Sequence, residues 1–131
     1  MWIDSHCHLD NSLLCQNSEE IINAYLAEGV DHVIIPAVSK YNFDKVINIA
    51  NMYKHCSYAL GYHPMYLDES EDADLKLLEN YLSENNSVAV GEIGIDLFHK
   101  KDNYLYQEDI FIAQLKIAKK LDLPVIIHAR G

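Results

Sequence analysis

This 131-residue chain has no long hydrophobic run and no paired cysteine spacing. The longest uninterrupted apolar run, Val33 to Val38, has six residues, whereas a membrane-spanning helix needs roughly 20. Trp2 follows Met1 without a basic and apolar leader, so we expect no secretory signal. The three cysteines are odd in number and have no paired spacing, which argues against a disulfide framework. We therefore expect a cytoplasmic protein that is not associated with a membrane.

Basic residues are also scarce. The chain has 10 Lys and Arg against 20 Asp and Glu, giving a formal net charge of −10. This balance argues against a protein that binds nucleic acid non-specifically through a basic surface. Half of the residues are hydrophobic and 23% are charged, a composition typical of a globular chain. The length favours one domain with a sizeable core.

Short apolar runs alternate with helical stretches along the whole chain. The runs are nearly continuous rather than alternating, which is typical of parallel strands covered on both faces; they lie at 2–4, 33–35, 58–61, 88–91 and 125–128. Helical periodicity fills the gaps. We expect the first helix to begin at Asn17 or Ser18, with Glu20 in capping-box spacing, and to end before Gly29. The sequence thus predicts an α/β fold of five strands and four helices.

A pair of histidines follows the first strand. His6 and His8 are two apart, so on an extended segment both side chains point the same way and can bind one metal ion. Imidazole suits zinc and similar divalent ions. A lone His-x-His pair is weak evidence, because two histidines exposed in a turn would look the same. Its position strengthens it, since ligand sites of parallel α/β folds lie at the carboxyl ends of strands.

Two other predicted strand ends carry groups that can bind metal. Glu92 follows the fourth strand between glycines, and His128 ends the fifth. Alone, Glu92 would be read as a solvated loop acid and His128 as a core histidine. The carboxyl ends of parallel strands meet at one edge, however, so both should converge with His6 and His8. Their coincidence favours a metal site.

The ordered motifs resemble those of TatD-type metal-dependent deoxyribonucleases. They are the segments 4–10 (DSHCHLD), 61–64 (GYHP), 91–96 (GEIGID) and 123–130 (LPVIIHAR), and the predicted helix 107–121 matches in register. The resemblance implies a (β/α)₈ TIM-type barrel, of which this chain would hold the first five strands and four helices. It departs from the family at Ala129, commonly Ser, and at Leu97 and Phe98, commonly Tyr. None of these three positions is a ligand.

The resemblance also implies function. The family hydrolyses DNA phosphodiesters with divalent metal; His6 and His8 would hold one ion, Glu92 would bridge to a second, and His128 would hold the second. We expect two ions (Mg²⁺, Mn²⁺ or Zn²⁺), because paired ions can activate water and stabilise both oxygens of a phosphoryl displacement. The net charge favours DNA ends or short single strands as substrate.

Two further residues are candidates for substrate contact. His63 ends the third strand before Pro64; the alternative is that it is a turn residue. The Arg130 guanidinium can donate two parallel hydrogen bonds to a phosphate; the alternative is that it is a surface charge. We take Glu92 and His63 as the catalytic candidates. Asp4 and Asp96 are candidates for orienting the histidine ligands. The remaining interpretations are structural. Asp10 and Gln107 are expected to cap helices or to be solvated, and the Cys7 side chain is expected to face the core. We expect no functional role for His32, His55 and His99.

Alternatives stay open at this point. A cyclic amidase or phosphatase on the same scaffold would share the His-x-His pair, although related amidases often bridge their metals with a carbamylated lysine where Glu92 stands. A truncated product without turnover is the other alternative. A (β/α)₈ barrel typically takes about 250 residues, so we expect residues 1–131 to be the N-terminal portion of one hydrolase barrel domain. By resemblance, later strands would add a His and an Asp. The open sheet edges at Ile3 and 125–127 favour self-association.

Overall fold

Strands and helices alternate through the computed structural model, which describes residues 2–67 and 73–131. The strands are β1 (Trp2–Asp4), β2 (Val30–Pro36), β3 (Cys56–Leu60), β4 (Ala89–Asp96) and β5 (Val125–Arg130). The α-helices are α1 (Ser18–Ala27), α2 (Phe43–Met52), α3 (Leu75–Glu84) and α4 (Tyr104–Leu121), and the short 3₁₀ helices are η1 (Cys15–Asn17), η2 (Lys40–Asn42) and η3 (Pro64–Tyr66). The predicted alternation of five strands and four helices is confirmed.

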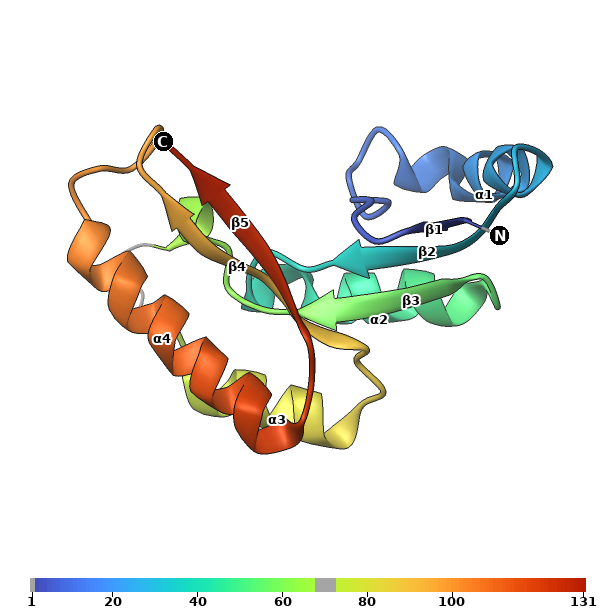
Figure 1. The fold of residues 1–131 in the computed structure, drawn as a ribbon. Coiled ribbons are helices and arrows are strands. Elements are labelled where there is room, and N and C mark those ends of the chain that lie inside the picture. Colours follow the sequence, from blue (N-terminus) through green and yellow to red (C-terminus); the bar gives the residue numbers. More distant parts are fainter. Residues whose placement is uncertain (1, 68–72) are drawn as a thin grey trace.

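All strand pairs are parallel, in the order β1-β2-β3-β4-β5. Each helix connects two neighbouring strands and packs beside the sheet, so the whole forms a half-barrel (Figure 1). The core between helices and sheet is apolar; its fully buried side chains include Leu9, Ile35, Phe43, Leu60, Leu78 and Ile93. The predicted α/β barrel architecture is therefore confirmed for this part of a barrel.

The strand β4 is longer than the sequence indicated. It pairs with β3 only through Ala89 and Val90 and then continues to Asp96 beside β5. Beyond the end of β3, the Glu92 N–H donates to the Ala37 carbonyl after β2, at 3.1 Å. Glu92 therefore lies within β4 and not in a loop after it, because the backbone pairing of β4 and β5 extends past the apolar run 88–91. His128 lies in β5, as expected, and this strand continues to Arg130.

Close approach of two backbones explains a glycine in this region. A Cβ built on Gly91 would lie 2.7 Å from the Ile126 Cβ and 3.0 Å from the Ile126 carbonyl oxygen. Any side chain here would force β4 away from β5. The absence of a side chain thus lets the strand that carries Glu92 run against the strand that carries His128.

Two local expectations are wrong. Asn17 makes no capping hydrogen bond with its side chain, because it belongs to η1, which leads directly into α1. The edge strands are not covered on both faces, since Trp2 is 73% exposed and Ile127 is 55% exposed. Within residues 2–67 and 73–131, each of these two strands pairs with a single neighbour, and its apolar side chains lie exposed at the edge of the sheet. The first helix ends before Gly29, as expected, and this glycine adopts a φ of 82°.

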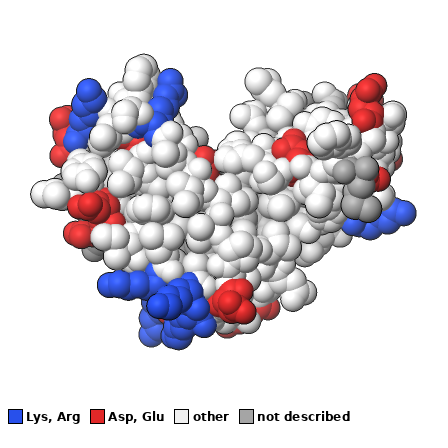
Figure 2. All heavy atoms as spheres, viewed as in Figure 1, with Lys and Arg blue, Asp and Glu red and all other residues white. Residues whose placement is uncertain are grey.

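One face of the molecule is hollowed. Figure 2 shows a hollow between the part that carries β5 and the part that carries α1, with acidic atoms visible at its floor. Basic residues gather away from the floor in this view. In residues 2–67 and 73–131, no helix is both long and apolar enough to cross a membrane.

Candidate metal centre

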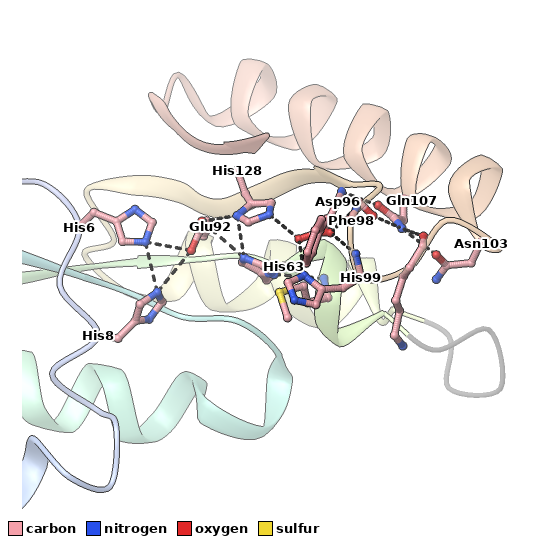
Figure 3. A network of polar contacts seen from close by, with 12 residues as sticks. His6, His8, His63, Glu92, Asp96, Phe98, His99, Asn103, Gln107 and His128 are labelled. Atoms are coloured by element: carbon pink, nitrogen blue, oxygen red, sulfur yellow. Dashed lines mark hydrogen bonds and ion pairs between the residues drawn. The ribbon is translucent and has the colours of Figure 1, made fainter. Parts of the chain in front are cut away.

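The Glu92 carboxylate lies between two groups of histidines (Figure 3). The residue is 4% exposed, and its side chain projects from β4 toward the loop after β1. Its Oε2 lies 3.0 Å from His6 Nε2 and 3.4 Å from His8 Nε2. The two Nε2 atoms are 3.2 Å apart. Three ligand-type atoms from β4 and the β1 loop therefore face one point.

The other carboxylate oxygen faces a second group. Glu92 Oε1 lies 3.1 Å from His128 Nδ1 and 3.4 Å from His63 Nε2. His63 Nε2 and His128 Nδ1 are 3.2 Å apart, and their ring centroids are separated by 4.3 Å. One carboxylate is thus shared by two sets of imidazole nitrogens, one set at each oxygen.

The spacing within each group fits a bound metal ion. Donor atoms that each lie about 2.0–2.1 Å from one ion are about 2.9–3.4 Å apart at angles of 90–109°. The separations are 3.0–3.4 Å among Glu92 Oε2, His6 Nε2 and His8 Nε2, and 3.1 Å between Glu92 Oε1 and His128 Nδ1. Imidazole and carboxylate are the donor types that zinc and similar divalent ions take. In both geometry and chemistry, the residues present suit divalent ions.

The electrostatics keep Glu92 ionised. Burial alone would raise the pKa of its carboxyl, but hydrogen bonds from His63 and His8 and the nearby histidine charges hold that pKa well below its usual range. The hydrogen bond to Glu92 in turn raises the pKa of His8, although burial opposes this. A buried anion surrounded by imidazoles is an arrangement that a cation can stabilise further.

Asp96 fixes the orientation of His128. The carboxylate is fully buried, and its Oδ2 lies 2.9 Å from His128 Nε2. Its Oδ1 accepts hydrogen bonds from the backbone N–H groups of Phe98 at 3.0 Å and His99 at 2.7 Å. Burial alone would raise the pKa of Asp96, but the His99 N–H and the His128 and His99 side chains outweigh it and hold that pKa well below its usual range. Asp96 is therefore a charged acceptor that directs His128 Nδ1 toward Glu92.

The His6 and His8 side has its own support. The backbone N–H of His6 donates to Asp4 Oδ1 at 3.0 Å. Asp10 is neither a cap nor a solvated residue: its Oδ2 accepts from Asn42 Nδ2 at 2.9 Å, and its buried Oδ1 lies 3.9 Å from His8 Nδ1. Lys45 Nζ on α2 also donates to the Asp10 carbonyl, so the loop after β1 contacts the start of α2. Cys7 packs against the core, with Sγ 3.8 Å from Tyr25 Oη.

Comparison with known proteins places this geometry in a family. The sequence profile described as "TatD related DNase" matches residues 3–131. The chain belongs to the TatD-related DNase family. The resemblance seen in the sequence motifs is thereby confirmed.

Members of the TatD-related family with similar sequences come from several organisms. YjjV of Escherichia coli K12 is 38% identical over 98% of this chain, and YabD of Bacillus subtilis 168 is 28% identical over 99%; both are named uncharacterized metal-dependent hydrolases. The crystal structure of YjjV, titled a TatD homolog, superposes with a TM-score of 0.92. It covers 98% of this chain and 51% of the YjjV chain. The chain spans about half the length of these TatD-related relatives.

The structure brings most of the predicted TatD-type site residues together. His6, His8, Glu92 and His128 converge, and His63 lies beside His128. Arg130 is not part of either group of ligand atoms among the described residues; its guanidinium instead lies 4.2 Å from the centre of the Phe98 ring. The expected contact between Arg130 and substrate therefore stays a prediction.

Two buried glutamines on α4 support this TatD-type site, and the sequence interpretation missed both. Gln114 accepts from the Tyr62 N–H at 2.7 Å and donates to the Tyr62 carbonyl at 3.1 Å, directly before His63. Gln107, expected to be capping or solvated, is fully buried; it accepts from the Asp96 N–H at 2.8 Å and donates to the Asp96 carbonyl at 3.2 Å. A sequence signal existed, since residues 107 and 114 share the helix face of the core residues Ile110 and Ile117.

Proposed function

We propose that the protein is a metal-dependent hydrolase that cleaves DNA phosphodiester bonds. The observation that carries this proposal is the shared carboxylate, because each oxygen of Glu92 faces its own set of imidazole nitrogens. Membership of the TatD-related DNase family supports phosphodiesters as the bond type. The names of the similar hydrolases support the dependence on metal.

In the proposed site, His6 and His8 would hold one divalent ion, His128 would hold a second, and the Glu92 carboxylate would be shared between them. A carboxylate suits the bridge because its two oxygens can bind two ions. The ions, as Mg²⁺, Mn²⁺ or Zn²⁺, would supply the Lewis acidity that activates water and offsets charge on the phosphoryl oxygens. The chain itself contributes position: Asp96 holds His128, and Glu92 stays anionic.

The charge distribution supports a restricted kind of DNA substrate. The net charge of −10 provides no broad basic surface for wrapping a duplex. Affinity would then come from the ions and from a few donors at the hollow, so we propose DNA ends or short single strands as substrate. The three free cysteines support a reducing, cytoplasmic location.

The test is a substrate screen with metal controls. The purified 131-residue chain is incubated with Mg²⁺, Mn²⁺ or Zn²⁺ and with single-stranded DNA, phosphomonoesters and dihydropyrimidines. Metal-dependent cleavage of DNA that His6→Ala abolishes supports the proposal. Cleavage of dihydropyrimidines alone would overturn it in favour of an amidase. Because the matched relatives are about twice as long, the same screen is run on the YjjV protein as a reference.

We further propose that residues 1–131 are the N-terminal part of one hydrolase barrel domain. The exposed apolar side chains of the edge strands, Trp2 and Ile3 on β1 and Ile127 on β5, support this, because further strands of such a barrel would cover them. Without those strands, the edges would pair with another copy. Light scattering and the DNA assay on the isolated chain test this. We expect association with another copy, reduced metal affinity and no meaningful DNA hydrolysis. A stable monomer with metal-dependent hydrolysis that His6→Ala abolishes would overturn it.

A further inference from the structure

His63 is the capping residue of the short helix η3. Its Nδ1 accepts a hydrogen bond from the Met65 N–H at 3.1 Å, and Pro64 occupies the first position of the helix. The residue is 5% exposed, and the Tyr66 ring packs edge-on against the imidazole with centroids 5.7 Å apart. The preceding peptide is held by Gln114. The ring is therefore fixed both in place and in rotation.

The cap determines which nitrogen carries the proton. A neutral imidazole has one N–H and one lone pair, and a backbone N–H can donate only to the nitrogen with the lone pair. Since Nδ1 accepts from Met65, the proton of His63 is on Nε2. Nε2 is the atom that faces Glu92 Oε1 and His128 Nδ1. A metal ligand would need a lone pair on Nε2. The capping hydrogen bond therefore makes His63 Nε2 a hydrogen-bond donor and not a metal ligand.

His128 has the opposite arrangement at the same point. Its Nε2 faces Asp96 Oδ2, and an ionised carboxylate can only accept, so the Nε2 of His128 carries the proton. Its lone pair is on Nδ1, toward Glu92. His128 thus presents the lone pair of Nδ1 to Glu92 Oε1, and His63 presents its Nε2–H to the same oxygen.

We propose that His63 is a hydrogen-bond donor whose Nε2–H binds an oxygen of a phosphate anion at the second ion position, and that it is not a ligand of that ion. This inference rests on the proposed function. His63 also lines an open cavity of about 290 Å³, together with His8, Asp10, Val38 and Tyr66. A phosphate in this cavity would lie against the His63 and His8 rings, both of which contact Glu92, so that charge and hydrogen bond could act on one anion.

The first test reads the tautomer directly. Nitrogen-15 NMR of the histidine rings in the full 131-residue chain distinguishes a protonated ring nitrogen from one with a lone pair. We expect His63 to have its proton on Nε2 and its lone pair on Nδ1. A proton on Nδ1 would overturn the inference, and this readout requires neither bound metal nor activity.

The second test separates a donor from a ligand. In Mn²⁺ titrations, we expect His63→Phe to bind as many ions as the wild type, with an affinity within about threefold, whereas His128→Phe loses one ion. Inorganic phosphate should bind the Mn²⁺-loaded His63→Phe protein about 10-fold or more weakly, the effect of one lost hydrogen bond to a charged group. His63→Gln, which restores an N–H donor, should recover part of this affinity.

The outcomes distinguish this inference from the proposed function. Loss of an ion in His63→Phe, or unchanged phosphate affinity, would show that His63 is not the proposed donor while leaving the hydrolase intact. A wild-type chain that binds no Mn²⁺ would count against the proposed function, and the NMR readout would still decide the tautomer of His63.

Discussion

Replacing Gln114 with alanine should destabilise the protein strongly. The side chain is 1% exposed and forms two hydrogen bonds to the backbone of Tyr62, a residue that is itself 4% exposed. Removing the amide leaves a buried N–H and a buried C=O without partners. Each unsatisfied group costs about 1–3 kcal/mol, so the expected loss for the two groups is about 2–6 kcal/mol. For a single domain of total stability about 5–15 kcal/mol, this is a large fraction.

The assay is urea unfolding followed by far-UV circular dichroism. With an m-value of roughly 1–3 kcal/mol per molar urea, we expect the midpoint to fall by about 1 M or more. Gln16→Ala is the matched control, because Gln16 is exposed, and should change stability by no more than about 0.5 kcal/mol. Gln114→Leu fills the same space without hydrogen bonds and should be destabilised as well. A Gln114→Leu protein as stable as the wild type would refute the argument from hydrogen bonding.

Three further predictions concern metal and thiol chemistry. A divalent ion at a concentration of 100 times its Kd should stabilise the wild-type chain by about 2.7 kcal/mol in thermal melts. The His6→Ala variant should lose most of this stabilisation. The His55→Ala control, at the other end of the sheet, should keep it. Asp96→Asn should lower ion affinity in calorimetry by about 10–100-fold, because His128 loses its charged acceptor; unchanged affinity would contradict that role. Burial raises the pKa of Cys56 to about 11, so the folded state favours the protonated thiol. The protonated thiol therefore contributes to folding stability below the ordinary thiol pKa. This contribution is lost as the pH rises through about 11. At pH 8, iodoacetamide should therefore alkylate Cys56 about 100-fold more slowly in the folded chain than in urea, and equal rates by mass spectrometry would contradict the shift.

The fold could be predicted from sequence because each element carries its own local signal. The apolar run 33–35 and the helical positions of α2 agree with the structure, and their order fixes a parallel sheet. Once the sheet is parallel, residues at the carboxyl ends of strands must meet. That explains why His6, Glu92 and His128 could be placed together from spacing alone.

The remaining features depend on contacts between distant segments. Gln107 looks like a solvated helical residue until the turn after β4 is seen to lie against it. The extension of β4 beyond Val90 arises from its pairing with β5, which no local pattern encodes. The tautomer of His63 follows from a backbone N–H two residues later, which requires the geometry of η3.

The contact between His6 and Glu92 has a mechanical consequence. The histidine follows β1 and the carboxylate lies on β4, strands that are separated in the sheet by β2 and β3. A flat sheet would hold them more than 10 Å apart, since neighbouring strands are about 4.8 Å apart, yet His6 Nε2 lies 3.0 Å from Glu92 Oε2. The curl of the half-barrel therefore brings together side chains from strands that do not pair with each other, so the site depends on the curvature of the whole sheet and not on any single pair of strands.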